Sequence, residues 1–317
     1  MGDLFDKLDK EKKQHVTDYK IDSKLSKCLE EIMKCYETCT SSRRSNYAGV
    51  RNCADSYVAF LSAIKRINYP AEAVTIFTNL LPKVRGDVYD MGLFISALVN
   101  NCKESDVTIC TRDFEYYIPF IGYMNSKNLN VIGPIGHKCF QYMLNSKVVI
   151  NGDVDDGLGY RMCNGEIIVN GNCTDCVGQL MEDGCIIVKG NADNDVGYNM
   201  SGGSIIVEGN CEDDLAHFMK GGMITIKGNA GDEIGTDCFK GIIMLGGNAG
   251  VDVGIKSGKE VKILLNGTCS SISGNLNHSE IYHQDKLVFK DGKPKDPNDF
   301  IELRKYRTYV PRWGWEK

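Results

Sequence analysis

The sequence lacks the features of a membrane or secreted protein. It contains no apolar run near the roughly 20 residues that a transmembrane helix needs. Residues 1–18 are highly charged, so we do not expect a signal peptide there. The 14 cysteines are scattered, without the pattern of a small disulfide-stabilised domain. We therefore expect a soluble protein of the reducing cytoplasm, with no membrane as a partner.

An excess of basic charge and the common catalytic motifs are also missing. The 37 lysines and arginines are outnumbered by 42 aspartates and glutamates, and the net charge of -5 argues against nucleic acid as a partner. The segment Gly254–Lys259 is one residue short of a phosphate-binding loop, and Glu260 stands where Ser or Thr should bind magnesium. No Gly-x-Ser-x-Gly nucleophile motif occurs. We assign no catalytic, cofactor-binding or metal-binding residue and expect no cofactor.

The sequence does contain a motif of about 19 residues, which is repeated seven times between residues 148 and 279. Each copy begins with three apolar residues; a glycine follows two positions later, and then usually an asparagine. Glycine adopts backbone angles that a side chain forbids, and asparagine hydrogen-bonds tight corners. The seven triplets are Val148–Ile150, Ile167–Val169, Ile186–Val188, Ile205–Val207, Ile224–Ile226, Ile243–Leu245 and Ile263–Leu265.

The length of this repeat predicts the fold. A unit so short cannot hold a core of its own, so it must bury its apolar side against the copies above and below it. The period leaves no room for a helix of about 10 residues, and the leucine-asparagine signature of leucine-rich repeats is absent. We predict a mainly β protein, a right-handed parallel β-helix of about seven or eight coils, each rising about 4.8 Å.

The chain before the clear repeats has helical periodicity, so we expect a small helical region at residues 1–105. Strand-like segments at Val107–Ile109 and Val131–Gly133 suggest that irregular coils start near residue 107, which places the β-helix at residues 106–280. Apolar residues recur every three or four positions in four segments, Lys24–Tyr36, Asn46–Ile67, Ala71–Leu81 and Asp87–Asn100.

Residues 281–317 are expected to form a C-terminal cap and an aromatic tail. A hairpin at His283–Lys295, turning at Asp291 and Gly292, would close the solenoid. Both tryptophans lie in the last five residues, and aromatic and arginine side chains are common anchors of protein interfaces. The tail either binds a protein partner or folds over the last coil as its cap. The candidate partner-binding residues are Tyr306, Tyr309, Arg312, Trp313 and Trp315.

Three groups of residues have the composition of a metal site, and each has a structural alternative. They are Cys173 with Cys176, the helical face of Cys28, Cys35 and Cys39 with Cys53, and His278 with Glu280 and His283. The first pair offers two ligands where a structural zinc needs four, and its first member aligns with alanines of other coils. The second group could hold an iron-sulfur cluster, but cysteine is also a common buried residue. The third could bind a metal from a loop, or its polar side chains could simply face the solvent. We favour the structural interpretation of all three.

Acidic residues recur at the second corner of the coil. Stacked at the coil spacing, they would form a negative ridge that could bind cations or a basic partner surface. The calcium-binding nonapeptide of other β-rolls is not matched, and aspartate favours turns for its own reasons, so we favour a structural role. The residues are Asp155, Asp156, Asp175, Asp193, Asp195, Asp213, Asp214, Asp232, Glu233 and Asp252.

The phrase Val-Gly-x-x-Met-x-Gly-Gly-x-Ile-Ile-Val-x-Gly-Asn, intact from Val196 to Asn210, resembles the GXGXG β-helix domain family. This domain is shared by the C-terminal part of the glutamate synthase large subunit and by one of the subunits of formylmethanofuran dehydrogenase. The resemblance covers roughly residues 130–275. It implies a right-handed β-helix that braces catalytic domains or subunits and carries no active-site residues of its own. The helical N-terminal region has no counterpart that we recognise in either family.

We therefore expect a non-catalytic scaffold that binds protein subunits of a redox, C1 or nitrogen-metabolism complex, or that forms a homo-oligomer. The alternative is a stand-alone enzyme acting on a small molecule or carbohydrate at the junction of the helical region and the solenoid. Carboxylate, histidine or lysine groups clustered in a cleft at that junction would favour the enzyme.

Overall fold

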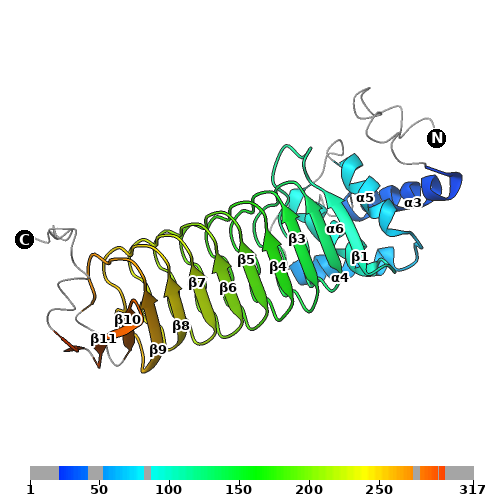
Figure 1. Cartoon of the computed structure of the whole chain (residues 1–317). Coiled ribbons are helices and arrows are strands. Elements are labelled where there is room, and N and C mark those ends of the chain that lie inside the picture. The colour runs from blue at the N-terminus through cyan, green and yellow to red at the C-terminus, as the bar shows by residue number, and fades with distance from the viewer. Residues whose placement is uncertain (1–20, 42–52, 82–86, 274–278, 292, 297–317) are drawn as a thin grey trace, which may run out of the picture.

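The computed structural model describes residues 21–41, 53–81, 87–273, 279–291 and 293–296. Within these residues the chain forms a helical region followed by a long stack of strands (Figure 1). The helices are α3 (Ser23–Ser41), α4 (Cys53–Ile64), α5 (Ala71–Leu80) and α6 (Val88–Asn101). The strands are β1 (Asp106–Cys110), β2 (Asn128–Ile132), β3 (Lys147–Asn151), β4 (Glu166–Val169), β5 (Cys185–Val188), β6 (Ser204–Val207), β7 (Met223–Ile226), β8 (Lys240–Leu245), β9 (Glu260–Leu265), β10 (Glu280–His283), β11 (Lys286–Lys290) and β12 (Lys293–Pro294).

The strands β1 to β10 form a parallel β-solenoid. Each pairs in parallel with the next strand along the chain, which gives about nine turns. The predicted parallel β-helix is confirmed. Strands β1 and β2 belong to the stack, as expected for the irregular early coils. The turn count exceeds the seven or eight expected because β10, which was expected in the C-terminal cap, also pairs in parallel with β9. The repeat arises from the register, since Ile167 pairs with Ile186 and Ile186 with Ile205, each 19 residues further on.

Alternate residues of each strand build the interior. In β5, Ile186 and Val188 are fully buried, whereas Ile187 between them faces outward and is half-buried. Burying such a side chain contributes about 1.5–3 kcal/mol. The other fixed apolar positions of the coil also point inward, as the alignment of Cys173 with alanines of other coils predicted for that position. The buried small residues are Cys173, Ala192, Cys211, Ala230, Ala249 and Cys269, and the buried methionines are Met162, Met181, Met200 and Met219.

The first corner of the coil is held by a ladder of asparagines. The side-chain Oδ1 of Asn191 accepts a hydrogen bond from the backbone N–H of Asn210 at 2.9 Å, and Asn210 accepts one from Asn229 at 2.8 Å. The preceding glycine is required because successive coils approach closely there. A Cβ at Gly209 would lie 2.7 Å from the carbonyl oxygen of Gly190. The Gly-Asn pair of the repeat therefore has a direct structural cause.

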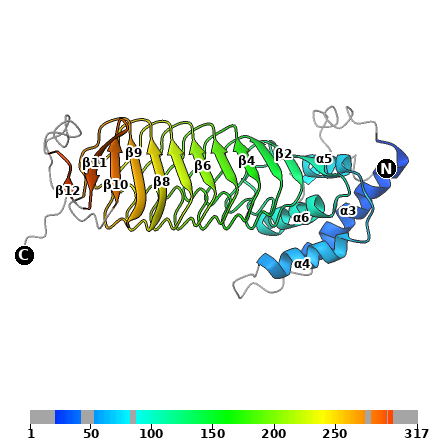
Figure 2. The same ribbon diagram turned by 60° about the horizontal axis from the view of Figure 1, so that its bottom comes forward.

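The helices pack at the N-terminal end of the solenoid and share one continuous hydrophobic core with it (Figure 2). Helix α5 lies against β1 and covers its unpaired edge. Thr75 Oγ1 donates a hydrogen bond to the carbonyl of Thr108 at 2.7 Å, and Thr78 Oγ1 accepts one from the N–H of Cys110 at 3.1 Å. Exposed strand edges invite pairing with other chains, so α5 serves as a cap.

The C-terminal end is closed by antiparallel strands. Strand β11 pairs antiparallel with β12, as predicted for a hairpin at Asp291 and Gly292, although Gly292 itself lies outside the described residues. A second tight turn at Gln284 and Asp285, which the sequence analysis missed, joins β10 to β11. Proline cannot donate to a sheet, and Pro294 lies on the outermost strand, which makes this edge a poor template for another strand.

Candidate functional site

The predicted partner-binding tail lies outside the described residues. Its five candidates, Tyr306, Tyr309, Arg312, Trp313 and Trp315, fall in residues 297–317, so their role stays a prediction. The charged segment 1–18 and the predicted helical start at residues 46–52 also fall outside them. None of the described helices has the length and apolar character needed to cross a membrane.

The cysteines proposed for a cluster lie on the first two described helices. Cys28 is buried on α3, and its thiol donates to the carbonyl of Asn68 at 3.3 Å. Cys35 and Cys39 follow on α3 and are half-buried, and burial, with Cys39 nearby, raises the pKa of Cys35 to about 12. Cys53 begins α4. All four cysteines lie in or pack against the hydrophobic core, which is the structural role that the sequence analysis favoured.

The remaining metal candidates are engaged within the fold. Cys173 is buried in the interior, while Cys176 is half-buried at a corner where burial, followed by the carboxylates of Asp156 and Asp195, raises its pKa to about 12. Glu280 accepts hydrogen bonds from Tyr282 Oη at 2.8 Å and Lys290 Nζ at 2.7 Å. Of the proposed loop site, His278 lies outside the described residues. In the described part of the chain, no three or more His, Cys, Asp or Glu residues are grouped as a metal would require.

The predicted acidic corner divides into two rows. In the first row, carboxylates hold successive coils together in the same way as the asparagines. Asp175 Oδ1 accepts from the N–H of Asn194 at 2.9 Å, and Asp213 Oδ1 accepts from the N–H of Asp232 at 2.7 Å. These residues therefore have a structural role, as the sequence analysis favoured, although they hold neighbouring coils together and do not act only within a turn.

In the second row, which we call the acidic row, the side chains stack without such bonds. Asp195, Asp214, Glu233 and Asp252 occupy equivalent positions with φ near 60°, a left-handed conformation that aspartate tolerates better than most residues. Burial raises the pKa of Asp195 and of Glu233, and the carboxylate of Asp214 between them raises both further. Like charges stacked at the coil spacing therefore repel one another in this row.

The outward face of the solenoid sheet carries a row of side chains that are apolar at all but one strand, and we call this row the outer stripe. It runs in register across seven neighbouring strands, and Thr225 is its only polar member. Most members are half-buried by their neighbours, and Met244 is 37% exposed. The exposed Met223 lies beside the stripe on β7. The outer stripe consists of Val149, Ile168, Ile187, Ile206, Thr225, Met244 and Leu264.

Charged side chains border the outer stripe, and they are paired with one another across strands. Four ion pairs join residues of neighbouring coils at 3.0 Å or less, and a fifth spans 3.9 Å. The pairs are Lys147–Glu166, Lys189–Glu208, Lys227–Glu208, Lys240–Glu260 and Lys262–Glu280. These five lysines and four glutamates sum to a net charge of +1, whereas the whole chain carries -5.

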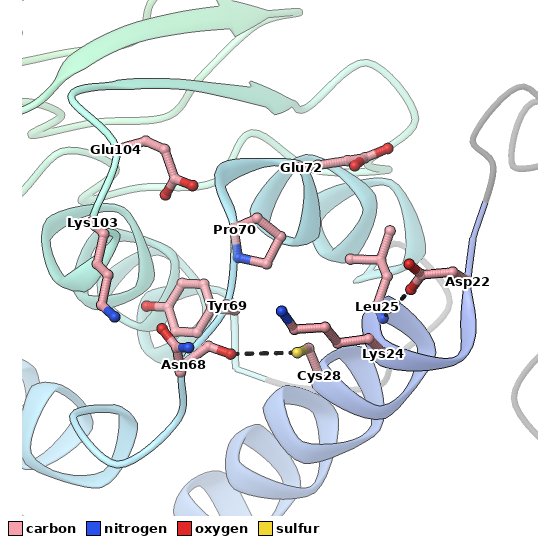
Figure 3. A pocket seen from close by; sticks show the side chains of 10 residues that line it. All are labelled: Asp22, Lys24, Leu25, Cys28, Asn68, Tyr69, Pro70, Glu72, Lys103 and Glu104. Atoms are coloured by element: carbon pink, nitrogen blue, oxygen red, sulfur yellow. Dashed lines mark hydrogen bonds between the residues drawn. The ribbon is translucent and has the colours of Figure 1, made fainter.

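A surface pocket with a volume of about 430 Å³ lies among the helices beside β1 (Figure 3). Lys24 of α3 reaches into the opening, with Lys103 and Glu104 of the α6–β1 connection on the opposite side. The thiol of Cys102 donates to Glu104 Oε2 at 3.1 Å, and this hydrogen bond lowers the pKa of Glu104. Glu104 is therefore suited to binding a cation rather than donating a proton. The pocket can hold a small molecule that carries both charges.

Sequence reasoning missed the outer stripe, and it named the junction of helices and solenoid as an alternative site without finding the residues that line this pocket. The stripe did leave a signal, because the middle residue of most triplets is apolar although alternation along a strand turns it outward. The pocket left none, since its walls come from three separate segments brought together by helix packing.

A comparison of the chain with models of known protein families finds no match, and neither does a comparison with curated proteins. The fold itself is established by the register of its strands. The resemblance to the GXGXG domain stays a prediction based on the phrase from Val196 to Asn210.

Proposed function

We propose that this protein is a non-catalytic scaffold that binds protein partners through the outward face of its solenoid. The observation that carries the proposal is the outer stripe, a row in register over seven strands that is apolar at every strand except at Thr225 and is bordered by paired charges. Large apolar patches rimmed by polar residues are typical of interaction surfaces. The ladders of hydrogen bonds between coils support the same role, because they make the solenoid a stiff support.

The kind of complex in which the scaffold acts is inferred from the predicted resemblance to the GXGXG domain. We place it in a redox, C1 or nitrogen-metabolism complex, in which a β-helix braces catalytic subunits. We place the protein in the reducing cytoplasm. All 14 cysteines lie in the described part of the chain as free thiols, which supports this placement.

The test is lysine-directed crosslinking of the full chain in extracts of its source cells. We expect crosslinks from Lys189 and Lys240, which border the outer stripe, to defined protein subunits. The double variant Ile187→Thr/Ile206→Thr should lose them, because it removes apolar side chains from the centre of the stripe while keeping β-branched residues. Crosslinks confined to Lys24 and Lys103 would contradict the proposal.

The pocket of Figure 3 favours a second candidate function, a small-molecule site at the junction of helices and solenoid. Lysine and carboxylate groups do cluster there, as this alternative requires. Amino acids and related zwitterions should then raise the melting temperature of the protein, and Lys24→Met should abolish the rise. The matched control Lys147→Met, on the solenoid, should leave it unchanged. A melting temperature that no zwitterion raises would dismiss this candidate.

A further inference from the structure

We infer that the outer stripe is a self-association surface on which a second copy of this chain packs face to face. The inference rests on the proposed scaffold function and names one partner of the same face. Ile168, Ile187 and Ile206 lie one above another in register at the centre of the stripe. Two sheets stack well at about 10 Å when both inner faces are apolar, so a second stripe is a natural cover.

The charges around the stripe select a copy of the same chain rather than a strongly charged partner. The bordering lysines and glutamates neutralise one another across strands, as Glu208 does between Lys189 and Lys227 at 2.8 and 3.0 Å. A basic or acidic partner would find few unpaired charges to contact on this face. Two copies can approach here without the repulsion that the chain's net charge of -5 and its row of stacked carboxylates impose elsewhere.

Both ends of the solenoid are protected against pairing with another strand, so association should occur through the outward face of the sheet. Helix α5 covers the edge of β1 through its threonine hydroxyls, and Pro294 lies on the edge strand β12. Growth by adding strands is therefore hindered at both ends. Contact through the same patch on both copies closes on itself about a two-fold axis, so it yields a dimer and not a filament.

The size of the stripe sets the expected affinity. Six inter-strand steps of about 4.8 Å give a length of roughly 29 Å, and a strand with its flanking residues spans about 20 Å. The resulting patch, on the order of 600 Å², is somewhat smaller than the roughly 800 Å² per partner of a typical stable interface. We expect a dissociation constant in the micromolar range.

Sedimentation of the full chain over a concentration series tests the inference. We expect a reversible monomer–dimer equilibrium, and a dissociation constant raised about tenfold or more by Ile187→Thr/Ile206→Thr. Threonine already occupies the equivalent position of β7 as Thr225, so the variant should fold. The control Tyr116→Thr removes an apolar ring that is 65% exposed and lies off the strands, and it should leave the equilibrium unchanged.

A second measurement needs no variant. Cys185 is half-buried on the outside of β5, next to the stripe, whereas Cys163 is half-buried in the connection between β3 and β4. Alkylation of Cys185 should slow as protein concentration rises through the dimer range, while that of Cys163 should not. A monomer at every concentration, or a dimer in which Cys185 stays equally reactive, would overturn the inference. Either result leaves the scaffold proposal standing if crosslinks to other proteins still map beside the stripe.

Discussion

The solenoid and the helical region bury their apolar side chains in different ways. In the solenoid, each residue stacks on its equivalent 19 positions away, as Ile186 does between Ile167 and Ile205. In the helical region, unlike residues from separate helices meet, and the ring of Phe94 contacts those of Tyr36, Phe60 and Phe77 at centroid distances of 5.0 to 5.7 Å. Stability is thus spread over many equivalent layers in one region and concentrated at a few residues in the other.

The largest effect that this comparison predicts comes from Phe94→Ala. The side chain is fully buried among three rings, and the cavity should lower the free energy of unfolding by about 3–5 kcal/mol. Helix signal should be lost at a lower urea concentration than strand signal in circular dichroism. Because α5 covers the edge of β1, light scattering should then report association of the uncapped solenoid.

A matched control lies in the solenoid. Phe239 is 60% exposed, so Phe239→Ala should change the free energy of unfolding by no more than about 0.5 kcal/mol. Equal stability of the two phenylalanine variants would mean that burial of Phe94 among the three rings does not carry the predicted loss. If the helix and strand signals of Phe94→Ala fell together, the helical region and the solenoid would unfold as one unit.

The same contrast explains what the sequence could reveal. Because equivalent residues stack on one another in the solenoid, the fold appears in the sequence as a regular period. The strands, the Gly-Asn corners and inward cysteines such as Cys173 could therefore be predicted. Helix spacing located α3, α5 and α6 closely. How the rings meet around Phe94, and how three segments form the pocket beside Lys24, depends on tertiary packing that leaves no periodic trace.

An intermediate effect is expected from the asparagine ladder. Asn210→Ala removes the oxygen that accepts the N–H of Asn229 at 2.8 Å, and we expect it to cost about 1 kcal/mol in thermal or urea unfolding. The control is Asn170→Ala, whose exposed amide bonds only the side chain of Asn151 at 2.8 Å and should matter less. If both variants lowered the free energy of unfolding equally, the hydrogen bonds of the asparagine ladder would not stabilise the solenoid more than an exposed amide bond does.

In the acidic row, the stacking of equivalent residues is unfavourable because it brings carboxylates close together. Asp195 and Glu233 both have pKa values raised by burial first and by Asp214 second. An acid whose pKa is higher in the folded than in the unfolded chain costs stability when ionised. That cost is present above the raised pKa and disappears as pH falls below the ordinary value near 4. At neutral pH the stacked carboxylates of neighbouring coils therefore repel one another, whereas uncharged amide side chains at the same positions would not.

Asp214→Asn should therefore stabilise the protein, and this is the smallest effect predicted. We expect a rise in melting temperature on the order of 1 °C at pH 7, shrinking towards pH 4 as Asp195 and Glu233 take up protons in both forms.

The control for this small change is Asp183→Asn. Asp183 lies at another corner, where its Oδ1 accepts the N–H of Gly184 at 2.8 Å, and Asn164 already makes the equivalent bond to Gly165 one coil earlier. This variant changes the net charge by the same amount but leaves the acidic row intact, so its melting temperature should show no comparable gain at pH 7. A gain for Asp214→Asn that matched the control, or that persisted unchanged at pH 4, would assign it to overall charge. Repulsion between stacked carboxylates would then not be its source.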